Sequence, residues 1–276
     1  MENFSKLLSL FVWQSIFFIT TLILGLVTAM EVRELVSIEQ IQVPSLELWK
    51  FLLIFVVATI FMVFFVRLPR GKGFLFRAFF IISVWWGGSI VLSVWLEDIL
   101  ALGILTVAVL VWLFRTNVFL HNILVILGIA GIASVFGLRF SPEAIVVLLI
   151  LFAIYDVIAV YKTKHMVRLA RAMLESRAIF AVVAPEKFSY FRSRMHDVAP
   201  GKGFMMLGGG DIAFPLMLVS SVSIDSIENA FVVMVFSFIG LSASFALFFL
   251  LGRRPMPALP PIAAFSILGF LFTKIM

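Results

Sequence analysis

Apolar runs long enough to cross a lipid bilayer recur from one end of the 276-residue chain to the other. A helix needs about 20 mainly apolar residues to cross the hydrocarbon core, and fewer where neighbouring helices shield its ends. Hydrophobic residues make up 63% of the chain and charged residues only 13%, and a soluble domain of this size could not bury so much apolar surface. We therefore predict an all-α, polytopic membrane protein with a single transmembrane domain over residues 1–276.

The apolar runs predict about nine transmembrane helices, the first of which we interpret as a retained span rather than a signal peptide, because it is longer than a signal core. The spans are expected at about 10–30, 51–66, 78–96, 99–114, 119–136, 144–161, 204–224, 230–251 and 258–273. The long loop 162–203 is expected to be a cytoplasmic connector on the lipid headgroups, with an interfacial amphipathic helix at about 164–177. The alternative for this loop is a lid or a substrate-docking segment.

On one side of this topology lie 17 of the 21 basic residues, and most of the acidic residues between spans lie on the other. The first side holds Lys6, Arg67, Arg70, Lys72, Arg77, Arg115, Lys162, Lys164, Arg168, Arg171, Arg177, Lys187, Arg192, Arg194, Lys202, Arg253 and Arg254. Cytoplasmic loops carry the excess of Lys and Arg, so we expect a multi-pass protein of the cell membrane with a cytoplasmic N-terminus and an extracellular C-terminus. Orientation thus explains the net charge of +6 without nucleic-acid binding.

Two acidic residues fall inside the predicted spans, Asp156 in the sixth and Asp211 in the seventh, and no Lys or Arg lies well inside any span to pair with them. Burying an ionisable group at membrane depth costs several kcal/mol, so a residue kept there indicates a functional role. At 1.5 Å per residue, Asp156 lies about 9 Å from Lys162, and Asp211 lies about 13 Å from Lys202. The two spans are consecutive and antiparallel, so the carboxyl groups can face each other at similar depth.

A pair of close carboxyl groups in a poorly solvated site is suited to acid–base catalysis. Ionising both carboxyl groups would cost much free energy, so one keeps its proton while the other can take a proton from water. The three glycines before Asp211 weaken the helix and allow a substrate backbone to come close. The prolines around Ala258-Leu259 interrupt regular helix at the ninth span, on the same side of the membrane.

Three short motifs resemble those of the presenilin and signal peptide peptidase family of intramembrane aspartyl proteases, especially its microbial, archaeal branch. They are Tyr155-Asp156 in the sixth span, Gly208-Gly209-Gly210-Asp211 in the seventh and Pro257-Ala258-Leu259 at the ninth. The resemblance covers essentially the whole chain. It implies that Asp156 and Asp211 cleave peptide bonds within transmembrane helices of membrane proteins, without metal or organic cofactor. It also implies that the Pro-Ala-Leu motif shapes the active site and that Tyr155 packs beside or positions the catalytic pair.

Other function classes stay open at this stage. An ion or proton transporter or channel could use the same acidic pair beside a broken helix. A prepilin-type peptidase shares a similar glycine–aspartate motif, and a catalytically inactive scaffold is a further alternative. The expected partners are substrate transmembrane segments and the bilayer, with no obligatory protein partner evident. Lipid-facing and protein-facing surfaces have similar composition, so a monomer and a homo-oligomer both fit the pattern. The chain has no cysteine, which excludes disulfides and thiolate metal sites.

Overall fold

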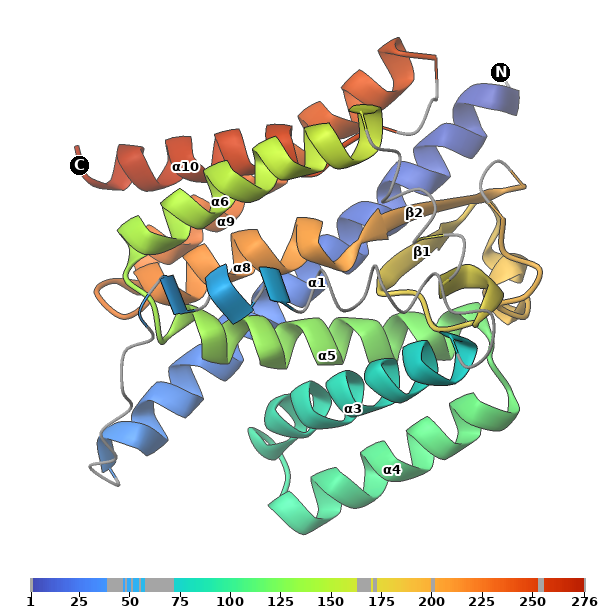
Figure 1. Ribbon diagram of the computed structural model, residues 1–276, viewed down its shortest axis with the longest axis horizontal. Coiled ribbons are helices and arrows are strands. Elements are labelled where there is room, and N and C mark those ends of the chain that lie inside the picture. Colours follow the sequence, from blue (N-terminus) through green and yellow to red (C-terminus); the bar gives the residue numbers. More distant parts are fainter. Residues whose placement is uncertain are drawn as a thin grey trace.

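A computed structural model gives a bundle of helices with one small β-sheet at one end (Figure 1). It describes residues 2–38, 47, 49–50, 52–54, 56–57, 72–162, 170, 173–199, 202–252 and 256–275. The helices are α1 (Glu2–Ile38), α3 (Lys72–Ser93), α4 (Asp98–Phe114), α5 (Val118–Gly137), α6 (Pro142–Val157), α8 (Gly209–Val222), α9 (Ile227–Leu250) and α10 (Leu259–Thr273). The strands are β1 (Ala181–Pro185) and β2 (Phe204–Gly208).

Five of the described helices are long and apolar enough to cross a membrane: α1, α3, α5, α9, and α6 together with the π-helical turn Ile158–Lys162 that extends it. Helices α4, α8 and α10 are apolar but shorter. The predicted second span, 51–66, lies mostly outside the described residues, of which 52–54 and 56–57 are helical. The described part of the chain therefore carries eight apolar helices, against the nine predicted for the whole.

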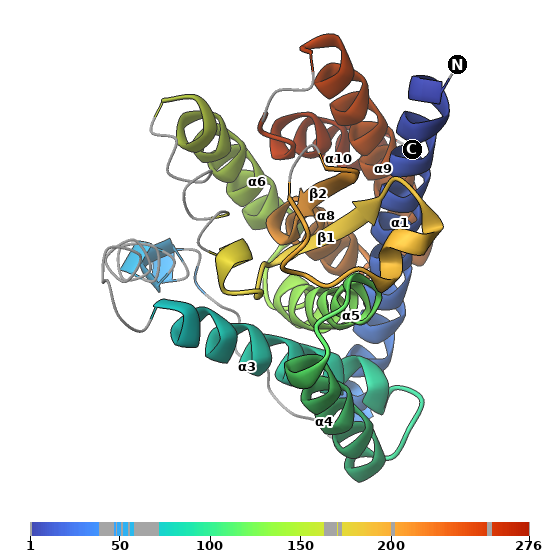
Figure 2. The same cartoon turned by 90° about the vertical axis from the view of Figure 1, so that its right-hand side faces the viewer.

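Helix α5 lies at the centre of the bundle, in contact with α1, α3 and α8 (Figure 2). Glycines bring the α3 and α5 backbones together, since a Cβ atom built on Gly131 would lie 1.8 Å from the Gly87 carbonyl oxygen. Small residues permit such close approach between membrane helices. On the other side, α9 packs against α10, and α10 packs against α6. This arrangement brings α6, α8 and α10 to a common junction.

The prediction of an all-α fold is wrong at one place, because β1 and β2 form a two-stranded antiparallel sheet. Residues 204–208, predicted as the start of the seventh span, are the second strand, and α8 begins only at Gly209. The strand forms because a partner segment from the preceding loop lies beside it, with Val183 opposite Met206. An apolar run alone does not distinguish a buried strand from part of a helix.

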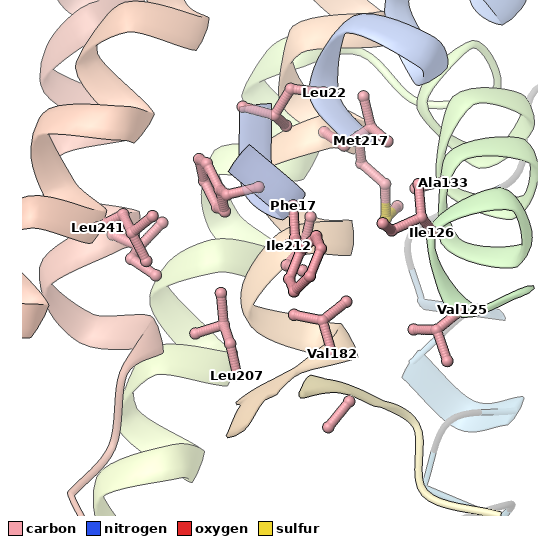
Figure 3. Close-up of a cluster of buried hydrophobic side chains, with 14 of the residues drawn as sticks. Phe17, Leu22, Val125, Ile126, Ala133, Val182, Leu207, Ile212, Met217 and Leu241 are labelled. Carbon is pink, nitrogen blue, oxygen red and sulfur yellow. The ribbon is translucent and has the colours of Figure 1, made fainter. Parts of the chain in front are cut away.

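The loop 162–203 is therefore not a plain connector on the membrane surface. All five residues of β1 are buried, and Val182 and Val183 are fully so. Figure 3 shows Val182 and Leu207, one from each strand, beside Ile212 of α8 and Phe17 of α1. Most of the predicted interfacial helix 164–177 lies outside the described residues; Ala170 and residues 173–175 are helical. The later part of the loop thus belongs to the hydrophobic core.

Candidate active site

Asp156 lies in the last turn of α6, where the regular helix gives way to the π-helical turn. Ser141 caps the start of this helix by accepting a hydrogen bond from the Ala144 N–H, and Pro142 occupies its first turn. The side chain of Asp156 is buried, with 7% of its surface exposed. Such π-helical turns are rare and are often found at functional sites.

Asp211 lies in the first turn of α8, directly after β2. Its carboxylate is hydrogen-bonded to the main chain of Gly208, and a helix N-terminus favours a negative charge. A Cβ atom on Gly208 would come within 3.0 Å of Asp211 Oδ2, so a side chain there would crowd the carboxylate. The glycine triplet thus forms a strand-to-helix junction, rather than the weakened helix interior that we predicted.

The two carboxyl groups lie close enough to interact electrostatically. Helices α6 and α8 are in contact, and Phe152 stacks on Phe214 with ring centroids 4.3 Å apart. Phe152 lies one turn from Asp156, and Phe214 lies one turn from Asp211. This aromatic contact fixes which faces of the two helices meet, and so turns both aspartates toward the same space.

The Pro-Ala-Leu motif reaches the same site from α10. The Leu259 N–H donates a hydrogen bond to Asp156 Oδ2 at 3.3 Å, and Leu259 itself is buried. Leu259 opens the helix, and the next two residues, Pro260 and Pro261, have no N–H. The single donor at the first three positions of this helix is therefore directed at a candidate catalytic carboxylate.

The remaining predicted site residues lie around this junction. Tyr155 is partly buried, and its hydroxyl is within electrostatic range of Asp156. The Gly209 N–H donates to the Phe180 carbonyl oxygen at 2.8 Å, which ties the glycine triplet to the segment before β1. Gly210 is exposed, and Pro257 and Ala258 precede the first residue of α10. Within the described residues, no three His, Asp or Glu side chains cluster as potential metal ligands.

The sequence did not predict an apolar cavity of about 190 Å³ beside the glycine triplet, between α3, α5 and α8. Its lining includes Val84, Gly128, Phe180, Gly209 and Ala213. We also did not predict the sheet that leads into Asp211. The available signal was the short apolar run before Pro185, with two adjacent valines, which is typical of a buried strand.

Comparisons with known proteins agree with this geometry. The family model described as signal-peptide peptidase, presenilin aspartyl protease matches residues 12–276. Two solved structures of a presenilin family intramembrane aspartate protease, in C222 and P2 space groups, have TM-scores of 0.64 and 0.63 at 21% and 23% identity. Each alignment covers 95% of this chain, with 95% and 96% of the other chains. No curated protein sequence matches this chain significantly. The chain therefore belongs to the signal-peptide peptidase and presenilin family of membrane-embedded aspartyl proteases.

Proposed function

We propose that this protein is an intramembrane aspartyl endopeptidase whose catalytic pair is Asp156 and Asp211. One observation carries the proposal: two carboxyl groups from separate apolar helices lie within electrostatic range of each other without a basic partner in either helix, and a third helix donates an N–H to one of them. Carboxyl groups in apolar helices are costly to bury, which is why such residues mark functional sites.

The pair can hydrolyse a peptide bond by sharing one proton. The ionised aspartate removes a proton from a water molecule as the water oxygen bonds to the scissile carbonyl carbon. The protonated aspartate donates to the carbonyl oxygen, which stabilises the tetrahedral intermediate. A proton then passes to the amide nitrogen as the C–N bond breaks, leaving a carboxylic acid and an amine. Titration belongs to the pair rather than to either residue.

The outer edge of β2 offers a place for an unwound substrate segment. In an antiparallel pair, the N–H and C=O groups of one residue point to the same side. Those of Val183 point away from β2, so those of Met206, which lies opposite, point away from β1. An extended segment can add to such an edge through backbone hydrogen bonds. Because β2 runs directly into Gly208 and Asp211, a peptide bound there would lie beside the carboxyl pair.

Contacts at the two ends of the bundle support the predicted sidedness. Lys6 forms an ion pair with Glu186 at 3.4 Å, so the start of α1 and the loop after α6 share one end. At the other end, the Arg33 guanidinium donates to the Ser223 carbonyl, and Lys274 pairs with Glu143. By the positive-inside rule, the first end is cytoplasmic. We propose the cell membrane as the location and transmembrane segments as the substrates.

Cleavage of a transmembrane peptide in liposomes by the purified protein tests this function. Asp156→Asn and Asp211→Asn are each expected to abolish cleavage, since neither amide can take the proton, while the thermal unfolding midpoint stays close to that of the wild type. Asp225→Asn, in the exposed turn after α8, is the matched control and keeps full activity. Cleavage that persists in either active-site variant would contradict the paired mechanism.

The transporter alternative is tested in the same liposomes. Proton or cation flux that needs both aspartates, without any peptide cleavage by the wild type, would replace the protease assignment. Flux draws no support from the site geometry beyond the acidic pair itself. The outer edge of β2, which pairs with no other strand in the described part of the chain, and the Leu259 N–H both suit the binding and hydrolysis of a peptide.

A further inference from the structure

The outer edge of β1 is occupied by a side chain from α5. The Asn122 Nδ2 group donates to the Val183 carbonyl oxygen, and the Val183 N–H donates to Asn122 Oδ1, both at 2.7 Å. Asn122 is 2% exposed, so these hydrogen bonds are made away from solvent. The Asn122 amide thereby satisfies both main-chain groups of Val183, as a residue of a third strand would. Figure 2 shows β1 lying between α5 and β2.

The neighbouring residue supports the same strand. The His121 ring is fully buried and stacks on Phe80, with ring centroids 5.3 Å apart and planes nearly parallel. Its Nε2 atom lies 3.3 Å from the Ala181 carbonyl oxygen, two residues before Val183 and on the same edge of β1. Helix α5 therefore contacts two successive outward-facing positions of the strand, which defines both its distance from the helix and its register.

A continuous set of contacts leads from this edge to Asp211. Val183 lies opposite Met206, and β2 ends at Gly208, whose main chain is hydrogen-bonded to the Asp211 carboxylate. The Gly209 N–H bonds to the Phe180 carbonyl oxygen, in the residue before β1. The chain is thus attached to β1 before Gly208, through the pairing of β2, and to the residue before β1 after Gly208, through Gly209. A displacement of β1 would therefore move Asp211.

We propose that Asn122, assisted by His121, is a positioning residue that sets the Asp211 carboxylate against Asp156 by clamping β1 to α5. The inference rests on the proposed function of the aspartate pair. The hydrogen bonds of Asn122 are to Val183 rather than to the carboxyl groups, so it acts through the sheet. Of the side chains that could replace it, only Gln also carries a primary amide, with its N–H donors and carbonyl acceptor, and Gln is one methylene longer.

The test compares purified Asn122→Ala with wild type for cleavage of a transmembrane peptide in liposomes. With the clamp removed, kcat per folded enzyme is expected to fall about 10- to 100-fold, as small misplacements of catalytic groups do. The cleavage positions should also spread to neighbouring peptide bonds, and hydrogen exchange should accelerate in residues 181–185 and 204–209. Ser221→Ala is the matched control, because it removes a buried hydrogen bond at the far end of α8, from Ser221 Oγ to the Phe140 carbonyl.

A purely structural role would reduce the amount of folded enzyme without moving the cleavage positions. Equal losses of kcat in Asn122→Ala and Ser221→Ala, with unchanged cleavage positions and exchange, would overturn the proposal. If Asn122→Ala does not fold, His121→Phe keeps a stacked ring, loses the bond to Ala181, and should give a smaller change of the same kind. No change in His121→Phe would then overturn it. A wild type without cleavage would contradict only the proposed function, since the exchange comparison still decides whether Asn122 holds the strands.

Discussion

The contact between α3 and α5 and the junction of α6, α8 and α10 are built in opposite ways. Between α3 and α5, regular helices touch through glycine backbones, as at Gly87 and Gly131. At the junction, each helix is irregular beside the aspartates: α6 passes into a π-helical turn, α8 follows a strand, and α10 starts at a proline-rich segment. Non-helical backbone at membrane depth is tolerated only where protein or water can satisfy it. The first region holds the bundle together, and we propose that the second presents backbone and carboxyl groups to a substrate.

The largest effect on the fold is expected from filling the glycine contact. Gly131→Ala would place a methyl group 1.8 Å from the Gly87 carbonyl oxygen, so α3 and α5 must separate. We expect a loss of about 1–3 kcal/mol in the free energy of unfolding, in line with overpacked cores. Gly103→Ala on α4, where nothing lies within 4 Å of the added atom, is the control and should not destabilise. Unfolding curves in detergent measure the stability of both variants. Equal curves would show that the α3–α5 contact does not depend on the absence of a side chain at Gly131.

A second substitution should affect the site without affecting the fold. Met206→Pro removes an N–H from the outer edge of β2, which β1 does not use, so stability should change little while kcat/KM falls. Met205→Pro removes an N–H that faces β1 at the pair with Ala184, and should lower both stability and activity. The measurements are unfolding midpoints and liposome cleavage for both variants. If Met206→Pro cleaves as well as the wild type, substrate does not bind this edge.

The smallest effect is expected at the surface. Lys6→Ala breaks the ion pair with Glu186, in which the Lys6 side chain is 36% exposed and the Glu186 side chain 18%. Such surface pairs contribute about 0–1 kcal/mol to the free energy of unfolding. The unfolding midpoint and the cleavage rate should therefore stay near wild type, as they should in Lys274→Ala at the opposite end of the bundle. A large loss of activity in Lys6→Ala alone would show that the loop after α6 takes part in catalysis, and would extend the active region beyond the junction.

The aspartates were predictable from sequence because a charge inside an apolar run is a local signal. Asp156 and Asp211 stand out without any knowledge of what lies beside them. The start of α8 was not predictable in this way. Whether residues 204–208 form a strand or a helical turn depends on β1, which lies about 20 residues earlier in the chain. Pairing between distant segments leaves little trace in local hydrophobicity.

Asn122 and His121 show the same limit on the α5 side. The prediction considered only charged groups within spans, and neutral polar residues in the run 119–136 were not singled out. Their partners are main-chain groups of β1, which carry no sequence signal of their own. Leu259 is a related case: the prolines that follow it mark a helix start, but its hydrogen bond to Asp156 depends on the packing of α10 against α6. The sequence shows which polar side chains are present, whereas only the folded structure shows which backbone groups they bind.

If Asp156 and Asp211 form a catalytic pair, their side chains must lie side by side at one site. Because the chain contains no cysteine, the double variant Asp156→Cys with Asp211→Cys can be cross-linked directly, by oxidation or with a short bis-maleimide. Val183→Cys with Met206→Cys, opposite each other in the sheet, is the positive control, and Asp156→Cys with Asp225→Cys, near the far end of α8, is the negative control. We predict that the first two pairs form an intramolecular cross-link, detected by mass spectrometry of proteolytic fragments, and that the third does not. A cross-link in the sheet pair without one between positions 156 and 211 would contradict the account.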